Sequence, residues 1–193
     1  MKWTRAVHHV QSLAETCAEM ATRPASIFPL RVSALWVAGE VLGKAADLDE
    51  IPVALVVDLP EVPWRTEPSG ARHWAAAARL PQTPVTPYWR SARAPVWNHV
   101  LHRPALVWSA AGGVEEMSLT AIAAGDGESV RVAEPSAEEL RARLADELAV
   151  SLRGLRDRNA EYTDRRWRPG KLEPVADALW QASTGYLDLL QVT

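Results

Sequence analysis

The stretch that decides the fold consists of Leu35-Trp36-Val37-Ala38-Gly39-Glu40 and, six residues later, Asp47-Leu48-Asp49-Glu50-Ile51-Pro52-Val53-Ala54-Leu55-Val56-Val57. Each half contains a compact apolar run with the length of a buried strand, so we expect strands over residues 32–38 and 53–57. Gly39 and Gly43 indicate a turn after the first strand, and residues 47–50 form a short acidic loop. The predicted order is therefore strand, glycine turn, acidic loop, strand.

Helical periodicity is found towards both ends of the chain. Residues 3–21 are predicted to form a helix, because apolar side chains recur at spacings of four and three before Pro24. Ser136 and Glu139 have the spacing of a capping box, and the leucines that follow predict a long helix to about Tyr162. After a break at residues 165–170, the same spacing over residues 172–190 predicts a last helix. Two successive helices with a short turn indicate an antiparallel hairpin.

The middle of the chain is rich in proline, which clusters between Pro81 and Pro104. An edge strand or an extended loop is expected there, because proline cannot donate a backbone hydrogen bond. A short helix capped by Ser69 is predicted before this segment, and a strand over residues 105–109 after it. Residues 114–133 are ambiguous, with a short strand at residues 130–132 as one interpretation.

These elements predict an α+β fold. We expect a small mixed β-sheet of three to five strands, flanked by the N-terminal helix and the C-terminal helical hairpin. Residues 1–135 would form the α+β core, and residues 136–193 the hairpin packed on it, so that the whole chain is a single structural unit.

Composition narrows the class of protein. Of 193 residues, 48% are hydrophobic and 23% are charged, which suits a globular domain. The net charge of −3 provides no basic field, so nucleic acid is not an expected partner. Cys17 is the single cysteine and excludes an intrachain disulfide. No apolar run approaches the ~20 residues of a membrane-spanning helix, and the start of the chain is amphipathic. We therefore expect a cytoplasmic protein without a membrane partner.

The deciding stretch resembles the start of a nucleotidyltransferase core of the polymerase-beta type. In that superfamily, a strand ends in a Gly-Ser turn that holds phosphate, and the next strand opens with an Asp-x-Asp pair that binds Mg²⁺. Here the pair falls on Pro52 and Ala54, neither of which can bind a cation, and Glu40 replaces the serine. The third strand, at residues 105–109, carries no acid. The resemblance thus implies a nucleotidyltransferase-like core that lacks the usual catalytic aspartates.

A second resemblance spans nearly the entire chain. Phrases such as Pro95-Val96-Trp97-Asn98-His99, together with residues 53–64, 150–157 and 179–182, resemble an uncharacterised actinobacterial family, a domain of unknown function. This resemblance implies no activity.

Candidate site residues fall into two groups. The ligand-binding candidates lie in the glycine turn and in the proline-rich segment, where aromatic and cationic side chains alternate: Gly39, Glu40, Trp89, Arg90, Trp97, Asn98 and His99. Such mixtures stack on planar ligands, and indoles packed on the sheet under arginine stems are the alternative. Asp47 and Asp49 are weak catalytic candidates, with a solvated acidic turn as the alternative. No metal site is expected, because His99 and His102 are too few ligands for zinc.

Three functional hypotheses are consistent with these residues. The favoured one is a catalytically degenerate nucleotidyltransferase-like protein that binds a partner protein or a small ligand and needs no cofactor. The second is an active Mg²⁺-dependent nucleotidyltransferase that uses Asp47 and Asp49. The third is a structural or interaction module that uses the segment rich in tryptophan and proline. The sequence leaves a homo-oligomer open.

Overall fold

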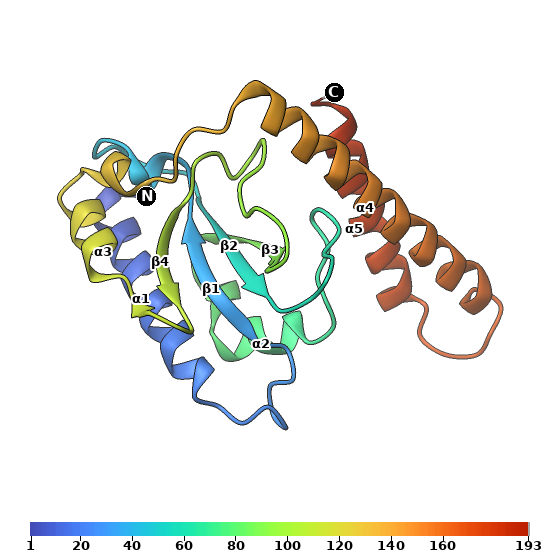
Figure 1. The fold of residues 1–193 in the computed structure, drawn as a ribbon. Coiled ribbons are helices and arrows are strands. Elements are labelled where there is room, and N and C mark those ends of the chain that lie inside the picture. The colour runs from blue at the N-terminus through green and yellow to red at the C-terminus, as the bar shows by residue number, and fades with distance from the viewer. Residues whose placement is uncertain (193) are drawn as a thin grey trace.

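The computed structural model describes residues 1–192 and contains, within them, five α-helices and five strands (Figure 1). In chain order they are α1 (Trp3–Ala21), β1 (Val32–Val37), β2 (Ile51–Val57), α2 (Ala71–Ala77), β3 (Val85–Ser91), β4 (Ala105–Ser109), β5 (Gly113–Val114), α3 (Glu116–Ala123), α4 (Ala137–Arg165) and α5 (Glu173–Leu190). The α+β class is therefore confirmed.

The strands form one mixed sheet in the order β3-β2-β1-β4-β5. β2 and β3 are parallel, whereas the other neighbours are antiparallel. Parallel strands need a crossover connection, and α2 lies in the one between β2 and β3. β3 confirms the edge-strand interpretation of the proline-rich segment. Pro87 lies within it, at the edge of the sheet, where a missing backbone N–H is tolerated.

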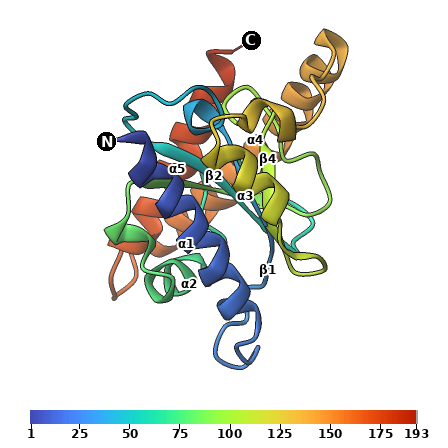
Figure 2. The ribbon, with the colours of Figure 1, turned by 90° about the vertical axis from the view of Figure 1, so that its left-hand side faces the viewer.

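Helices α1, α2 and α3 pack on one face of the sheet, and Figure 2 shows α1 and α3 in front of the strands. Side chains alternate along a strand, so Leu35 and Val37 of β1 point to this face together with Val53 and Leu55 of β2. Each such buried side chain contributes about 1.5–3 kcal/mol relative to its exposed state. The main hydrophobic core therefore lies on the helical side of the sheet.

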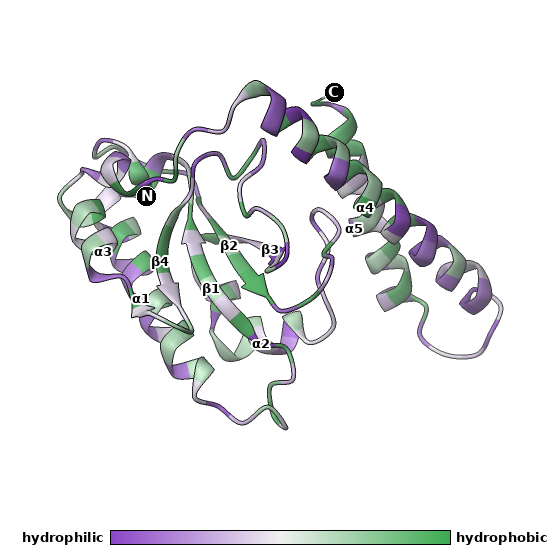
Figure 3. Ribbon diagram, in the orientation of Figure 1, coloured by the Kyte–Doolittle hydropathy of each residue, from purple (hydrophilic) through white to green (hydrophobic). Residues whose placement is uncertain are grey.

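The opposite face of the sheet is covered by the loops after β2 and β3 and by the hairpin of α4 and α5 (Figure 1). Trp36, Ala54 and Tyr88 point to this side and form a smaller cluster with Trp64 and Leu189. In Figure 3, hydrophobic residues follow the strands, whereas much of α4 is hydrophilic. The hairpin side is therefore the more polar of the two layers.

Two glycines allow the hairpin to approach the loop that follows β2. Gly154 of α4 faces the ring of Pro63, and Gly185 of α5 faces the backbone of Trp64 so closely that an added Cβ would overlap its carbonyl oxygen. The C-terminal helical hairpin that the sequence predicts is confirmed by α4 and α5, which pack against each other. Its first helix begins with the expected capping box between Ser136 and Glu139.

Some local predictions were wrong. β2 begins at Ile51 and not at Val53, and α4 continues to Arg165. The short strand that was one interpretation of residues 130–132 is absent from the described chain. Instead, residues 127–130 form a 3-10 turn, after which one backbone hydrogen bond joins Val132 to Pro104. Ser69 does not cap α2, because Gly70 takes that position in a left-handed conformation (φ 86°) close to Leu30.

Candidate functional site

Trp64 lies at the junction of the sheet, the loops and the hairpin. Its indole is 1% exposed, stacks on Tyr88 of β3 with ring centroids 5.0 Å apart, and meets the edge of His99 at 5.3 Å. Its ring N–H donates to Oδ2 of Asp188 on α5 at 2.6 Å. Its backbone N–H donates to Oγ of Ser151 on α4 at 3.0 Å. One residue thus connects β3, a loop and both helices of the hairpin.

A buried cluster of charges lies beside Trp64. Glu147 of α4, with a side chain 5% exposed, forms ion pairs with Arg90 of β3 and, at 2.9 Å, with Arg143 of α4. Asn98 donates from Nδ2 to both carboxylate oxygens of Glu147, at 3.0 and 3.3 Å. Since two guanidinium groups share one carboxylate, the cluster has a net positive charge.

The cluster also has unused donors. Nε of Arg90 and Nε of Arg143 are buried and have no hydrogen-bond acceptor in residues 1–192. Burial lowers the pKa of Arg143, the nearby charge of Arg90 lowers it further, and Glu147 opposes both effects. A buried charge that is incompletely compensated is costly, and a further anion at this position would stabilise it.

A cavity of about 350 Å³ opens next to the charge cluster. One part of its wall is polar and is formed by Asn98, His99, His102, Arg141, Arg143 and Glu147. The other part is apolar and consists of Leu140, Leu144 and Val192. The polar wall residues outside the charge cluster are Arg141, which is cationic, and His99 and His102, whose side chains become cationic on protonation. The cavity therefore suits a small molecule that has an anionic group and an apolar part.

Backbone geometry orients Asn98 towards Glu147. Its Oδ1 accepts hydrogen bonds from the backbone N–H groups of Val100 at 3.0 Å and Leu101 at 2.8 Å. The amide is thereby held with its Nδ2 towards the carboxylate. This local turn explains why an asparagine fits position 98. It also holds Asn98 in place as one part of the cavity wall.

Three of the ligand-binding candidates lie together. Arg90, Asn98 and His99 surround Trp64 and Glu147, and Trp97 lies half-buried in the same loop. Trp89 points to the opposite face, where its ring meets Trp74 at 5.9 Å. This separation follows from the alternation of side chains along β3.

The other candidates lie elsewhere. Gly39 and Glu40 begin the 3-10 turn after β1, and neither belongs to the cavity wall. The carbonyl oxygen of Gly39 accepts a hydrogen bond from Arg131 at 3.0 Å. Asp47 and Asp49 are exposed on either side of the buried Leu48.

The acidic residues do not assemble into a cation site in the part of the chain that the structure describes. No group of three or more His, Cys, Asp or Glu side chains that could hold a metal ion occurs there. Asp58 follows β2 at the end opposite to Asp49, and its nearest cation is Arg93 at 3.9 Å.

Sequence reasoning missed four residues of the junction: Trp64, Arg143, Glu147 and Asp188. The sequence contains a pattern that could have identified two of them. Arg143 and Glu147 are four residues apart and lie between the leucines at positions 140, 144 and 148, on the side of α4 that should be buried. A charged pair within an apolar helix stripe suggests a partner from another element.

Comparison with known proteins identifies the family. The model of a domain of unknown function, DUF7711, matches residues 1–193. The chain belongs to the DUF7711 family. No curated protein and no solved structure matches it. Membership of DUF7711 agrees with the predicted uncharacterised family, whereas the actinobacterial source and the nucleotidyltransferase-like core stay predictions. None of the described helices of this DUF7711 protein has the length and apolar character needed to cross a bilayer.

Proposed function

We propose that this protein binds a small anionic molecule in the cavity beside Arg143 and does not transfer nucleotides. One observation carries the proposal. The buried Arg90 and the partly buried Arg143 share the carboxylate of Glu147, Arg143 lines the cavity, and its buried Nε has no acceptor in the described chain. A bound carboxylate or phosphate supplies the missing negative charge.

The shape and lining of the cavity specify the rest of the ligand. Leu140, Leu144 and Val192 offer apolar surface, so the anionic group is joined to a short hydrocarbon or aryl part. Arg141 is exposed at the same cavity and adds positive charge to its entrance, where His102 is also exposed. The volume of about 350 Å³ is within the range of small-molecule sites.

The absence of nucleotidyl transfer is proposed from side-chain chemistry. Pro52 and Ala54 occupy the positions at which the resembling superfamily has metal-binding carboxylates. Ala54 is fully buried and packs in the cluster of Trp64 and Tyr88. The space above Ala54 on this face of the sheet is therefore occupied by the protein's own aromatic rings, Trp64 and Tyr88. We expect labelled triphosphate and Mg²⁺ to give no transfer by the wild type, Asp47→Ala or Asp49→Ala. Transfer that either variant abolishes would establish the acidic loop as an active site.

Titration calorimetry with four probes tests the binding proposal: hexanoate, phenyl phosphate, inorganic phosphate and the neutral hexanamide. We expect at least one of the two amphipathic anions to bind and hexanamide not to bind. Their comparison with inorganic phosphate separates an amphipathic ligand from a free anion. Tighter binding of inorganic phosphate than of both amphipathic anions would contradict the apolar part.

Arg143→Met is the decisive variant. It leaves Arg90 and Glu147 as a balanced pair, so the fold should be retained while anion affinity falls by roughly tenfold or more. Arg153→Met is the matched control, because Arg153 lies on the same helix but pairs with Glu61 at the surface. Equal binding by wild type and Arg143→Met would overturn the proposal.

A further inference from the structure

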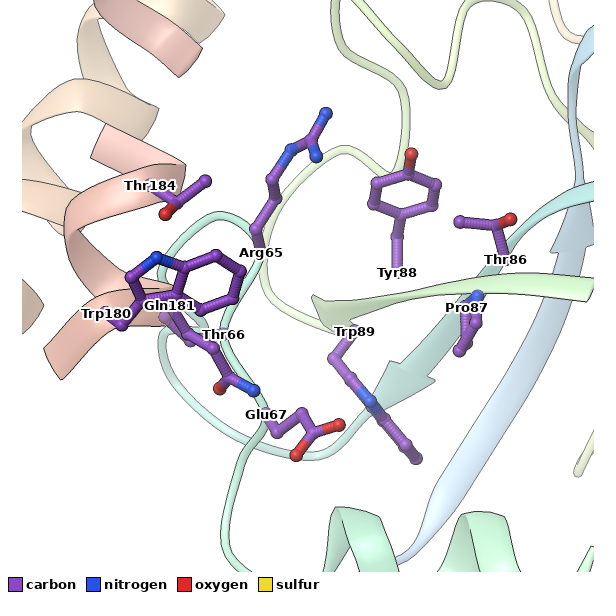
Figure 4. A pocket seen from close by; sticks show the side chains of 10 residues that line it. All are labelled: Arg65, Thr66, Glu67, Thr86, Pro87, Tyr88, Trp89, Trp180, Gln181 and Thr184. Atoms are coloured by element: carbon purple, nitrogen blue, oxygen red, sulfur yellow. The ribbon is translucent and has the colours of Figure 1, made fainter. Parts of the chain in front are cut away.

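A second pocket lies on the outer side of the edge strand, separate from the cavity beside Arg143. It has a volume of about 250 Å³ and opens between β3 and α5, as Figure 4 shows. Strand β3 contributes Pro87 and Tyr88, the loop after β2 contributes Arg65, and α5 contributes Trp180 and Thr184. No residue of its wall lines the cavity beside Arg143.

Trp180 gives this pocket an aromatic wall. Its side chain is 68% exposed on α5, although an indole is among the most favourable groups to bury. By contrast, Trp89, which also lines the pocket, and Trp64 of the junction are both buried. An exposed indole at the edge of a hollow offers a flat face on which a planar ring can stack.

Arg65 adds a cation next to that indole. Its Nε donates to Asp188 at 3.0 Å, and its terminal nitrogens have no acceptor among residues 1–192. Figure 4 places its guanidinium between Trp180 and Tyr88. The residue is held in a left-handed backbone conformation (φ 57°) that is costly for a side chain other than glycine. The two terminal nitrogens of Arg65 are therefore free to donate to a ligand in the pocket.

Tyr88 supplies a third donor. Its ring is fixed by the stack on Trp64, and its hydroxyl makes no hydrogen bond within the described chain. Burial raises the pKa of Tyr88, so the hydroxyl stays protonated and can donate. The pocket therefore combines one flat aromatic surface with donors from Arg65 and Tyr88, which together suit acceptor oxygens on an aromatic ring. Glu67 also lines the pocket, but its carboxylate is paired with Arg72 at 2.7 Å.

We propose that this pocket is a second binding site and that it takes a small aromatic carboxylate. The ring stacks on Trp180, and the carboxylate accepts hydrogen bonds from the terminal nitrogens of Arg65 and from the Tyr88 hydroxyl. The volume accommodates a molecule with one or two rings. An extended peptide added to β3 is disfavoured, because Pro87 interrupts the row of backbone donors along this strand.

Titration calorimetry tests the site, with benzoate and indole-3-carboxylate as probes and benzamide as the neutral analogue. We expect the carboxylates to bind, and Trp180→Ala to weaken them roughly tenfold. Trp180→Phe keeps an aromatic face and should restore most of the affinity. Trp167→Ala is the matched control, because Trp167 is 81% exposed in the turn between the two helices and is remote from the pocket.

Two further variants show which residues bind the probes. Arg65→Gln should remove the preference for benzoate over benzamide, and Arg143→Met should leave binding of the aromatic carboxylates at the Trp180 pocket unchanged. Unaltered affinity in Trp180→Ala, or benzamide binding as tightly as benzoate in the wild type, overturns the proposal. Loss of binding in Arg143→Met with none in Trp180→Ala would instead assign these probes to the first cavity, so the two proposals fail separately.

Discussion

At the scale of single residues, the buried charges depend on Glu147. Its carboxylate is the only ion-pair partner that the structure gives to Arg90 and Arg143 within residues 1–192, and it also accepts from Asn98. We expect Glu147→Gln to lower the free energy of unfolding by about 3 kcal/mol, because it leaves the buried Arg90 and the partly buried Arg143 without their ion-pair partner. Urea denaturation followed by circular dichroism measures this change.

The control for this prediction is Glu161→Gln on the same helix. Glu161 pairs with Arg158 at 2.8 Å, but both side chains are about 40% exposed. Pairs of this kind contribute about 0–1 kcal/mol. A loss in Glu147→Gln no larger than in Glu161→Gln would show that the buried cluster has another source of charge balance.

Asp188 gives a prediction about acid stability. Burial opposes its ionisation, but hydrogen bonds from Trp64 and Arg65, together with the Arg65 charge, hold the pKa of Asp188 below its usual range. A depressed folded-state pKa adds stability that is present above the unfolded-state value of about 3.9 and is lost as the pH falls through the folded-state value.

We therefore expect the wild type to lose stability below about pH 4 more steeply than Asp188→Asn. Urea denaturation at a series of pH values measures the two slopes. Asp146→Asn, an exposed position on α4, is the control and should keep the wild-type slope. Identical slopes for all three proteins would mean that Asp188 does not contribute to acid sensitivity.

At the scale of elements, the hairpin is positioned by a glycine. Gly185 of α5 lies against the carbonyl oxygen of Trp64, and this contact places α5 beside the aromatic cluster. Alanine at this position would favour the helix by about 1 kcal/mol but would collide with backbone that cannot rotate away. We expect Gly185→Ala to destabilise the protein by about 2 kcal/mol in net terms, as measured by thermal and urea unfolding.

The reverse substitution, from alanine to glycine at an exposed helical position, measures the effect of helix propensity without a change in packing. Ala149→Gly on α4 should cost about 1 kcal/mol through propensity alone. If Gly185→Ala instead raised stability, the hairpin would not be held against Trp64 as the structure shows.

At the scale of the whole molecule, the Trp64 junction makes the sheet and the hairpin interdependent. Trp64 bonds to both α4 and α5, and Arg90 of β3 is neutralised from α4. We expect a single cooperative unfolding transition, with coincident midpoints for tryptophan fluorescence and for helical circular dichroism. A separate earlier loss of helix signal would show that residues 136–193 unfold as an independent unit.

Much of the element order is encoded locally. The four-and-three spacing in residues 3–21 and the capping box at Ser136 each involve residues within a few positions of one another, so α1 and the start of α4 were predictable. The apolar runs likewise identified β1, β2 and β4. The cap at Ser69 was mispredicted and residues 130–132 stayed ambiguous, because the path of the chain over Leu30 and the 3-10 turn depend on tertiary contacts.

The candidate site could be predicted only in part. Arg90, Asn98 and His99 stand out in the sequence because aromatic and cationic residues alternate there. Strand alternation separates Trp89 from Arg90, but the sequence did not indicate which of the two would face the hairpin. Their partners are distant: Glu147 is 57 residues from Arg90 and 49 from Asn98, and Asp188 is 124 from Trp64. Periodicity and capping act over a few residues and therefore determined the helices and most of the strands. Which face of β3 meets the hairpin, and hence which charges are buried together, was decided by long-range packing, because only the folded chain brings those side chains out of water at the same place.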